Sequence, residues 1–423
     1  MYFLVLFCIK ILKKNLKKIL IIVQRSNGDV FLSYSLIKKL YEYYDSPLID
    51  LLVNDDTISI AKLFPYINRI HTFSYKDKKY KRWVQEKNII FSIFKKYDLS
   101  INLTASDRSV FYALLAGIKT ISAVESNKQK SWWKTIILTH YYYFDSSEHI
   151  LSNNLKPLEC LKIKYDNILQ VPISNEKTLV SIQKKLEKIG VDRFIIFHPS
   201  AQYNYKIYPQ YLRDQLFSFL NTLGIHILIT GSNNSIDLDI KNKLPRLANI
   251  IDFIGETSIA EFVALSNLSL AYIGMDTLNM HIAAAQNKRI FAIFGPSNLS
   301  MWSPWSNQLG LSAKLDRPIQ SYGNITIFQA NMPCVACGKS GCNDNHGNSD
   351  CLDNINPENI FSEIKDWYLK LSHPAEITIL NETNINSRKI LLYIVYGEDQ
   401  TYYDGAIFSF LTFKNWILDN SNI

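Results

Sequence analysis

The sequence has few cysteines and no long apolar run. Its 423 residues include 6 cysteines, which do not make a disulfide framework in a chain this large. The apolar run within residues 1–12 is only about ten residues long, whereas a transmembrane helix needs roughly 20. Lysines follow this run instead of preceding it, and no small-residue cleavage site comes after it, so it does not predict a secretory signal. The sequence therefore predicts a cytoplasmic protein.

Two common phosphate-binding motifs are also missing. Neither G-x-G-x-x-G nor G-x-x-x-x-G-K-[ST] occurs, which disfavours a plain dinucleotide enzyme and a P-loop NTPase. The composition, 47% apolar and 20% charged, is that of a globular protein. The length suits two domains with additional segments.

The net charge of +8 is unevenly distributed. Within residues 76–96 only Asp77 and Glu86 are acidic, and the basic residues are Lys76, Lys78, Lys79, Lys81, Arg82, Lys87, Lys95 and Lys96. Such a stretch suits an acidic partner, namely a phosphorylated glycan, an anionic lipid or a nucleic acid, although an ordinary solvated helix face explains it equally well. The lysines within residues 10–18 would likewise allow the N-terminal segment to lie on an anionic membrane surface.

Short apolar segments alternate with helical patterns along most of the chain. Strands are predicted at 18–24, 48–53, 69–73, 99–103 and 120–124, and again at 193–197, 226–230, 250–254, 269–274 and 289–294. This alternation predicts an α/β protein with two Rossmann-like, doubly wound parallel sheets facing across a cleft. Residues 125–147 show no clear period, and a helix interrupted by Pro157 is expected at 148–163.

These patterns divide the chain into four parts. We expect a basic and apolar N-terminal extension at 1–17, a first Rossmann-like domain at 18–172 and a second Rossmann-like domain at 173–372. The remaining extension, 375–423, contains one predicted strand and one predicted helix, which cannot bury a core alone. It either docks on the second domain or begins a further domain that this sequence does not complete, and the polar break before it favours the latter.

A strand–turn–helix at residues 269–286 predicts a phosphate site. The strand is expected to end at Gly274. Either Asp276 or Thr277 would be a good helix N-cap, and a helix is expected from about Met280. The start of such a helix presents free amides and the positive end of the helix dipole to an anion. His281 in its first turn could contact a phosphate, but a structural role is equally plausible.

Polar residues also follow three other strands of the second half. Ser200 and Lys206 follow the first strand, Gly231 the second and Glu256 the third. A hydroxyl and an ammonium group at the carboxyl end of a strand suit a pyrophosphate. The sequence thus predicts one anion-binding edge in the second half.

Asp29 stands in a glycine turn directly after the first strand. A carboxylate at that place could act as the general base that removes a proton from an acceptor hydroxyl. The alternative is a helix N-cap, for which aspartate is among the preferred residues.

Four cysteines form a second signal. A C-x-x-C pair and two further thiols suit a tetrahedral zinc or iron site, and the ligands would be Cys334, Cys337, Cys342 and Cys351. The loop 334–351 has little core of its own, so a metal would stabilise it. Four free thiols are the alternative.

Three of these segments resemble one family. The sets R-S-N-G-D at 25–29, H-P-S…K at 198–206 and G-M-D-T-x-x-M-H-x-A-A-A…F-G-P-S at 274–297 are similar to the family 9 glycosyltransferases, the ADP-heptose:lipopolysaccharide heptosyltransferases. The resemblance covers roughly residues 18–372. It implies the GT-B fold, with residues 18–172 as the acceptor-side domain and residues 173–372 as the nucleotide-sugar-binding domain. It also implies an inverting and metal-independent transfer, with ADP-heptose as donor. Leu278 departs from the pattern, because several members have glycine there, and this leaves the identity of the donor open.

The resemblance also implies roles for the residues singled out above. The aspartate that matches Asp29 deprotonates the acceptor, and the lysine that matches Lys206 stabilises the departing phosphate. Asp276, Thr277 and His281 match donor-site positions. Similar cysteines occur in some members and in the iron-binding motif of autotransporter heptosyltransferases, so a metal in the loop would be structural.

The expected activity is therefore transfer of a heptose onto a lipopolysaccharide or lipooligosaccharide core. The acceptor would be a phosphorylated, lipid-linked glycan met by residues 76–96, with peripheral contact to the inner membrane and no nucleic-acid partner. Two alternatives remain: O-heptosylation of an adhesin protein, and a non-catalytic sugar-nucleotide-binding protein.

Overall fold

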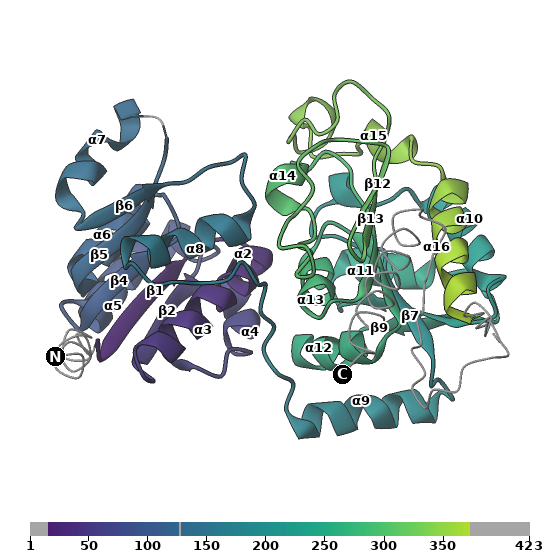
Figure 1. The fold of residues 1–423 in the computed structure, drawn as a ribbon, viewed down its shortest axis with the longest axis horizontal. Coiled ribbons are helices and arrows are strands. Elements are labelled where there is room, and N and C mark those ends of the chain that lie inside the picture. The colour runs from purple at the N-terminus through teal and green to yellow at the C-terminus, as the bar shows by residue number, and fades with distance from the viewer. Residues whose placement is uncertain (1–15, 127, 373–423) are drawn as a thin grey trace, which may run out of the picture. The chain divides into compact units, whose positions relative to one another are not determined.

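The computed structural model describes residues 16–126 and 128–372. The predicted extensions 1–17, apart from residues 16 and 17, and 375–423 lie outside the described residues. The chain divides into one compact unit that ends at Phe361 and a second that begins at Ser362. Both sheets belong to the first unit (Figure 1).

The first sheet contains six parallel strands in the order β3-β2-β1-β4-β5-β6. They are β1 (Lys18–Val23), β2 (Leu48–Asn54), β3 (Ile67–Phe73), β4 (Tyr97–Asn102), β5 (Gly117–Val124) and β6 (His140–Tyr143). The central strand β1 has the sequence KILIIV and is buried from Ile19 to Val23, as expected for a parallel strand covered on both faces.

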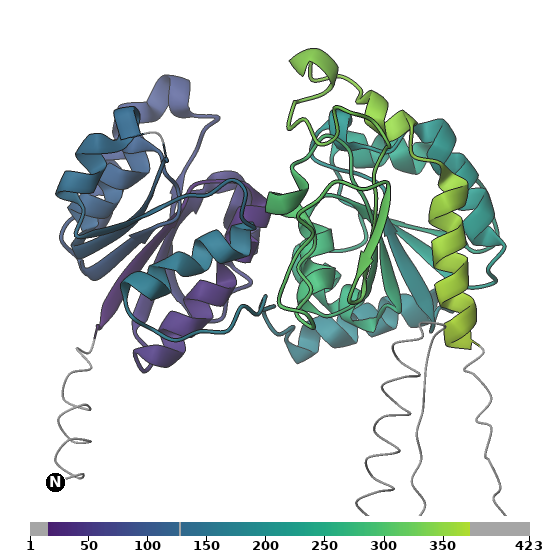
Figure 2. The ribbon, with the colours of Figure 1, turned by 45° about the horizontal axis from the view of Figure 1, so that its top comes forward.

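Helices cover both faces of this sheet (Figures 1 and 2). One core cluster packs α5 (Lys78–Ile93) and α6 (Asp107–Ala116) against one face, and a neighbouring cluster on α6 adds α7 (Lys128–Ile137). The large cluster on the other face includes residues of α2 (Asn27–Leu32), α3 (Tyr34–Tyr43), α4 (Ile58–Ala61) and α8 (Ile150–Cys160). A short 3-10 helix, η1 (Asp55–Thr57), precedes α4.

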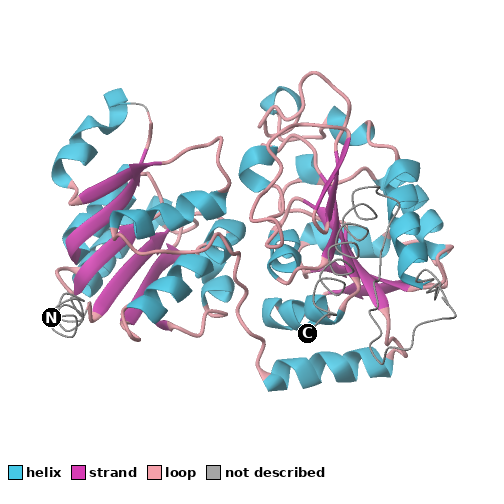
Figure 3. Cartoon of the chain, viewed as in Figure 1, coloured by secondary structure: helices cyan, strands magenta, loops and turns pink. Residues whose placement is uncertain are grey.

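The second sheet has the order β12-β13-β11-β10-β7-β8-β9 (Figure 3). Its strands are β7 (Phe194–His198), β8 (His226–Gly231), β9 (Ile250–Ile254), β10 (Ala271–Met275), β11 (Arg289–Ile293), β12 (Ile319–Tyr322) and β13 (Ile325–Phe328). All pairs are parallel except β12 with β13. The two parallel-dominated sheets confirm the predicted fold class.

Helices and short turns connect these strands. They are α9 (Glu176–Lys188), η2 (Asn204–Lys206), α10 (Gln210–Asn221), α11 (Ser235–Asn242), α12 (Ile259–Leu268), α13 (Leu278–Ala285), α14 (Leu299–Trp302), η3 (Cys342–Asp344), α15 (Asp350–Asp353) and α16 (Pro357–Ser372). Asn175, Asn234 and Ser258 each accept a hydrogen bond from a backbone amide as N-caps of α9, α11 and α12, which satisfies one of the free amides at each helix start. Among the helices of the described ranges, none is both long enough and apolar enough to cross a bilayer.

The connecting segment after α8 is bonded to both halves. Asn307 receives a hydrogen bond from Leu169 N at 2.7 Å and donates one to Leu169 O at 2.9 Å. Gln170 N donates to Ser35 Oγ on α3 at 2.9 Å. His149, the N-cap of α8, accepts from Leu151 N through Nδ1 and therefore donates through Nε2 to Ser303 O at 2.9 Å.

Candidate active site

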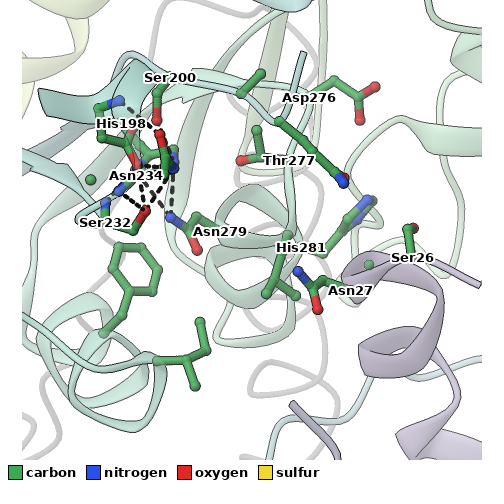
Figure 4. Close-up of a pocket in the computed structure, with 18 of the residues that line it drawn as sticks. Ser26, Asn27, His198, Ser200, Ser232, Asn234, Asp276, Thr277, Asn279 and His281 are labelled. Carbon is green, nitrogen blue, oxygen red and sulfur yellow. Dashed lines mark hydrogen bonds between the residues drawn. The ribbon is translucent and has the colours of Figure 1, made fainter. Parts of the chain in front are cut away.

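One pocket of about 500 Å³ is lined by residues of both halves. Ser26, Asn27 and Gly28 contribute from the turn after β1, and the segments after β7, β8, β9 and β10 contribute the opposite wall (Figure 4). These four strands are neighbours in the second sheet. Because the carboxyl ends of parallel strands meet at one edge, four polar segments far apart in sequence converge there.

The helix α13 begins in this pocket as predicted. Thr277 is its N-cap, and Thr277, Leu278, Asn279 and His281 line the pocket. A Cβ built on Gly28 would lie 3.8 Å from His281 Cδ2, so the starts of α2 and α13 are in close contact. Free amides at the start of α13 favour an anionic ligand.

Lys206 and Asp276 form an ion pair beside the start of α13. Lys206 Nζ donates to Asp276 Oδ2 at 2.8 Å. Burial alone would lower the pKa of Lys206 and raise that of Asp276, yet their mutual attraction raises the pKa of the lysine and lowers that of the carboxyl group. Both groups are therefore charged at neutral pH. The ammonium group therefore offers a positive charge to an anion bound at the start of α13.

His198 and Asn279 form the polar floor of the pocket. The Asn279 amide nitrogen lies 3.0 and 3.1 Å from the two ring nitrogens of His198, and Ser200 Oγ lies 3.3 Å from Nε2. Burial lowers the pKa of His198 and of His281 to about 4. Both rings are thus neutral hydrogen-bonding groups at pH 7, and the prediction from sequence missed the contribution of Asn279.

The pocket also has an apolar part, formed by Ile259, Phe262 and Trp302. Asp237 closes the polar side: its Oδ2 accepts bonds of 2.7 Å from Ser232 N, Ser232 Oγ and Asn234 Nδ2. A flat ring with an attached anion matches this division into apolar and polar walls.

Several buried polar atoms at or next to the pocket have no hydrogen-bond partner among the described residues. They are Gln24 Nε2 and Oε1, Asn27 Oδ1, Asn54 Oδ1 and His281 Nδ1. Unpaired buried groups cost about 1–3 kcal/mol each. Asn27 and His281 line the pocket, so a polar ligand there would satisfy their unpaired atoms.

Of the predicted site residues, Lys206, Ser200, Gly231, Asp276, Thr277 and His281 line the pocket. Glu256 and Asp29 are not among the lining residues. Glu256 is exposed, and its neighbour Thr257 lines the pocket instead.

Asp29 is buried one residue from Gly28. Its Oδ2 accepts bonds from Ser26 Oγ at 2.6 Å and Ser26 N at 3.2 Å, and its Oδ1 lies 3.0 Å from Arg25 Nε. The N-cap of α2 is Ser26, so the alternative that Asp29 is the cap is wrong. Asp29 is instead the third residue of the helix, in a reciprocal pairing with the cap.

The predicted metal site is not supported. Within residues 16–126 and 128–372, no group of three or more histidine, cysteine or acidic side chains is arranged to hold a metal ion. The sulfurs of Cys334, Cys337, Cys342 and Cys351 are free. Cys351 is buried, Cys342 is partly buried, and Cys334 and Cys337 are exposed. Burial, together with the other three thiols, raises the pKa of Cys351 to about 12.

Two parallel-dominated α/β sheets with one ligand pocket lined by both halves define the GT-B class of glycosyltransferases. The chain belongs to glycosyltransferase family 9 (heptosyltransferase), whose sequence model matches residues 92–321.

Individual relatives agree with this assignment. Lipopolysaccharide heptosyltransferase 3 of Escherichia coli K12 is 27% identical over 296 residues, which are 67% of this chain and 84% of the relative. A family 9 glycosyltransferase structure from Veillonella parvula superposes with a TM-score of 0.65 at 18% identity, covering 84% of this chain and 98% of the other. The E. coli ADP-heptose lipopolysaccharide heptosyltransferase II structure gives 0.61 at 19% identity, covering 84% and 99%.

Proposed function

We propose that this glycosyltransferase moves a heptose from ADP-heptose onto a lipopolysaccharide or lipooligosaccharide core. The supporting observation is the pocket in which the starts of α2 and α13 meet beside Lys206. The relatives carry lipopolysaccharide heptosyltransferase names, and one carries ADP-heptose in its name.

In this proposal the donor occupies the second half. The adenine ring of the donor lies on the apolar wall at Ile259 and Phe262. The pyrophosphate of the donor lies at the start of α13, where Ser200, Thr277 and Lys206 also line the pocket. The reaction itself needs no metal or other cofactor, because Lys206 supplies the positive charge that stabilises the leaving ADP.

The transfer step would be a single displacement with inversion. An acceptor hydroxyl oxygen attacks the anomeric carbon, the bond from that carbon to the phosphate oxygen breaks, and its electron pair leaves with ADP. Asp29 accepts the hydroxyl proton through Oδ1, the oxygen that pairs with Arg25 Nε at 3.0 Å, whereas Oδ2 is held by Ser26. General-base catalysis of this kind contributes about 10²–10⁴-fold.

The role of Asp29 is the part of this proposal that the family match does not cover, because residues 25–29 precede the matched range. The test is Asp29→Asn, which keeps the shape of the side chain and its acceptor oxygen toward Ser26. We expect kcat to fall by about 10²–10⁴ while the Kd for the donor, measured by calorimetry, stays within about twofold. Asp166→Asn, at an exposed position outside the pocket, is the matched control and should leave both constants unchanged.

Other outcomes separate the alternatives. Unchanged turnover in Asp29→Asn would remove Asp29 as the base. Absence of turnover in the wild type with every sugar donor that shifts its melting temperature would favour a non-catalytic sugar-nucleotide-binding protein. Transfer to an adhesin polypeptide, and none to a lipid-linked core, would move the activity to protein O-heptosylation.

A further inference from the structure

The helix α7 buries two polar side chains and exposes large apolar ones. Ser131 and Lys134 are each only 1% exposed, whereas Trp132 and Ile136 are 62% and 71% exposed. Lys134 Nζ is satisfied internally by Ala105 O and Glu125 Oε2, both at 2.7 Å. A surface helix in water shows the opposite arrangement.

The helix α5 also exposes large apolar side chains. Ile89 and Ile93 pack into the core, whereas Trp83 is 84% and Phe91 68% exposed. Lys87, on the same outward face, places Nζ 5.8 Å from the Phe91 ring centroid. Two aromatic side chains of this helix are therefore exposed to solvent.

The helices that carry these side chains are neighbours, because α6 contacts both α5 and α7. α5, α6 and α7 cover the same face of the first sheet through adjoining core clusters, and Phe111 on α6 stacks on Trp133 of α7 at 5.3 Å between ring centroids. We define the aromatic face as the exposed side chains Trp83, Phe91, Phe111, Trp132, Ile136 and Ile137.

The charge around the aromatic face is positive. Exposed basic residues of this layer are Lys81, Arg82, Lys87, Lys95, Lys96 and Lys119. Of the acidic side chains nearby, Asp77 is exposed, Glu86 accepts a hydrogen bond from Tyr112, and Lys134 pairs with Asp107 at 2.8 Å and with Glu125. An isologous contact with a second copy would bring these like charges together, which disfavours self-association.

We propose that the aromatic face docks on an anionic lipid bilayer surface. Such a bilayer has a boundary between headgroups and acyl chains that suits exposed tryptophan and isoleucine next to lysine and arginine. The aromatic rings enter this interface, and the cations contact the anionic headgroups. The inference rests on the proposed function, since a lipid-linked acceptor would be presented at such a surface. It also fits the topology, because α5 and α6 begin at the carboxyl edge of the sheet, the edge at which Ser26 and Asn27 enter the pocket.

The test is binding of the full chain to vesicles by flotation, with and without about one third anionic phosphatidylglycerol in phosphatidylcholine. We expect binding to the anionic vesicles that weakens at about 0.5 M salt, and a loss of at least about tenfold in partitioning for Trp83→Ser combined with Trp132→Ser. Ile173→Ser combined with Leu315→Ser, at positions 93% and 61% exposed elsewhere in the chain, is the matched control and should bind as the wild type does.

Equal binding of the wild type and the aromatic-face variant would overturn the proposal, as would equal binding to neutral vesicles. A concentration-dependent dimer that the same substitutions abolish would assign this face to a second copy instead. Donor affinity in solution is measured on every variant. If the wild type binds vesicles but shows no turnover, the docking surface stands and the proposed function fails. If the wild type shows turnover on a delipidated core sugar but does not bind vesicles, the proposed function stands and the docking surface fails.

Discussion

Lys206 Nζ and Asp276 Oδ2, 70 residues apart in sequence, lie 2.8 Å from each other at the start of α13. The ion pair fixes the ammonium group at the place proposed for the donor phosphates. It also means that neither charge can be removed without leaving the other buried and unpaired, which costs several kcal/mol in well-enclosed sites.

Lys206→Met removes the charge but keeps the apolar stem. We expect kcat to fall by about 10²–10³, because a positive charge that stabilises the leaving group acts mainly in the transition state. The double variant Lys206→Met with Asp276→Asn should lose less activity than the two single variants lose together. The corresponding coupling free energy is about 0.5–3 kcal/mol. A Lys206→Met enzyme with a lowered melting temperature but normal kcat would show that the pair only stabilises the fold.

Asp50 should make the stability of the protein depend on acid pH. This buried carboxylate on β2 accepts hydrogen bonds from Tyr97 Oη at 2.7 Å and Asn68 Nδ2 at 2.8 Å, and His71 Nε2 lies 3.8 Å away. Burial alone would raise the pKa of Asp50, but these partners lower it from 3.8 to about 2. A lowered folded-state pKa contributes stability above pH 4, and that contribution is lost as the pH falls from about 4 to 2.

Asp50→Asn should therefore lower the free energy of unfolding at pH 7 by about 2 kcal/mol and flatten its pH dependence between pH 4 and 2. Urea titrations at pH 7 and pH 3 measure both effects, and Asp166→Asn should follow the wild type at each pH. The same acid sensitivity in Asp50→Asn as in the wild type would assign it to other carboxylates.

Two glycines beside the pocket should respond differently to alanine. A Cβ at Gly274 would lie 2.7 Å from His198 O and 2.6 Å from Tyr272 Oη, so β7 and β10 would have to move apart. We expect Gly274→Ala to cost about 1–3 kcal/mol in the free energy of unfolding. Gly28→Ala meets only His281 Cδ2, at 3.8 Å, and should fold as well as the wild type or better, because alanine favours helix. Equal losses in both variants would contradict the close packing of these strands.

The cysteine loop allows a direct test of the predicted metal. Elemental analysis of the purified protein counts any bound zinc or iron. Because Cys334 is exposed, Cys334→Ser is expected to leave the melting temperature of the chelator-treated protein unchanged. One bound metal per chain that Cys334→Ser removes would restore the site predicted from the spacing of the cysteines.

The sheets could be predicted because parallel strands are buried on both faces. Such strands are short and almost entirely apolar, like Ile19–Val23, and each predicted strand occurs within a few residues of its place. The anion-binding edge followed from the same cause, since residues after β7, β8, β9 and β10 must meet when the four strands are parallel neighbours.

The elements that could not be predicted have unusual burial. Residues 125–147 form α7 and β6, and no period was visible because α7 buries Lys134 and exposes Trp132. The hairpin strands β12 and β13 have only four residues each, too few for a clear pattern. Asn279 was missed because its role arises from proximity to His198, 81 residues away. The pairing of Asp29 with Ser26 and Arg25 was not predicted, because it depends on the helix α2 beginning at Asn27.

The bonds that tie the connecting segment to the second half restrict how family members can be recombined. The Asn307 side chain exchanges two hydrogen bonds with the backbone of Leu169, and Trp305 Nε1 donates to Asn167 O at 3.0 Å. A chimera that takes its acceptor-side half from one enzyme and its donor-side half from another must therefore inherit residues 161–175 and the 303–307 loop from the same parent. Otherwise the buried amide and indole groups at this junction would lose their partners, and the hybrid would fail before its specificity could be assayed.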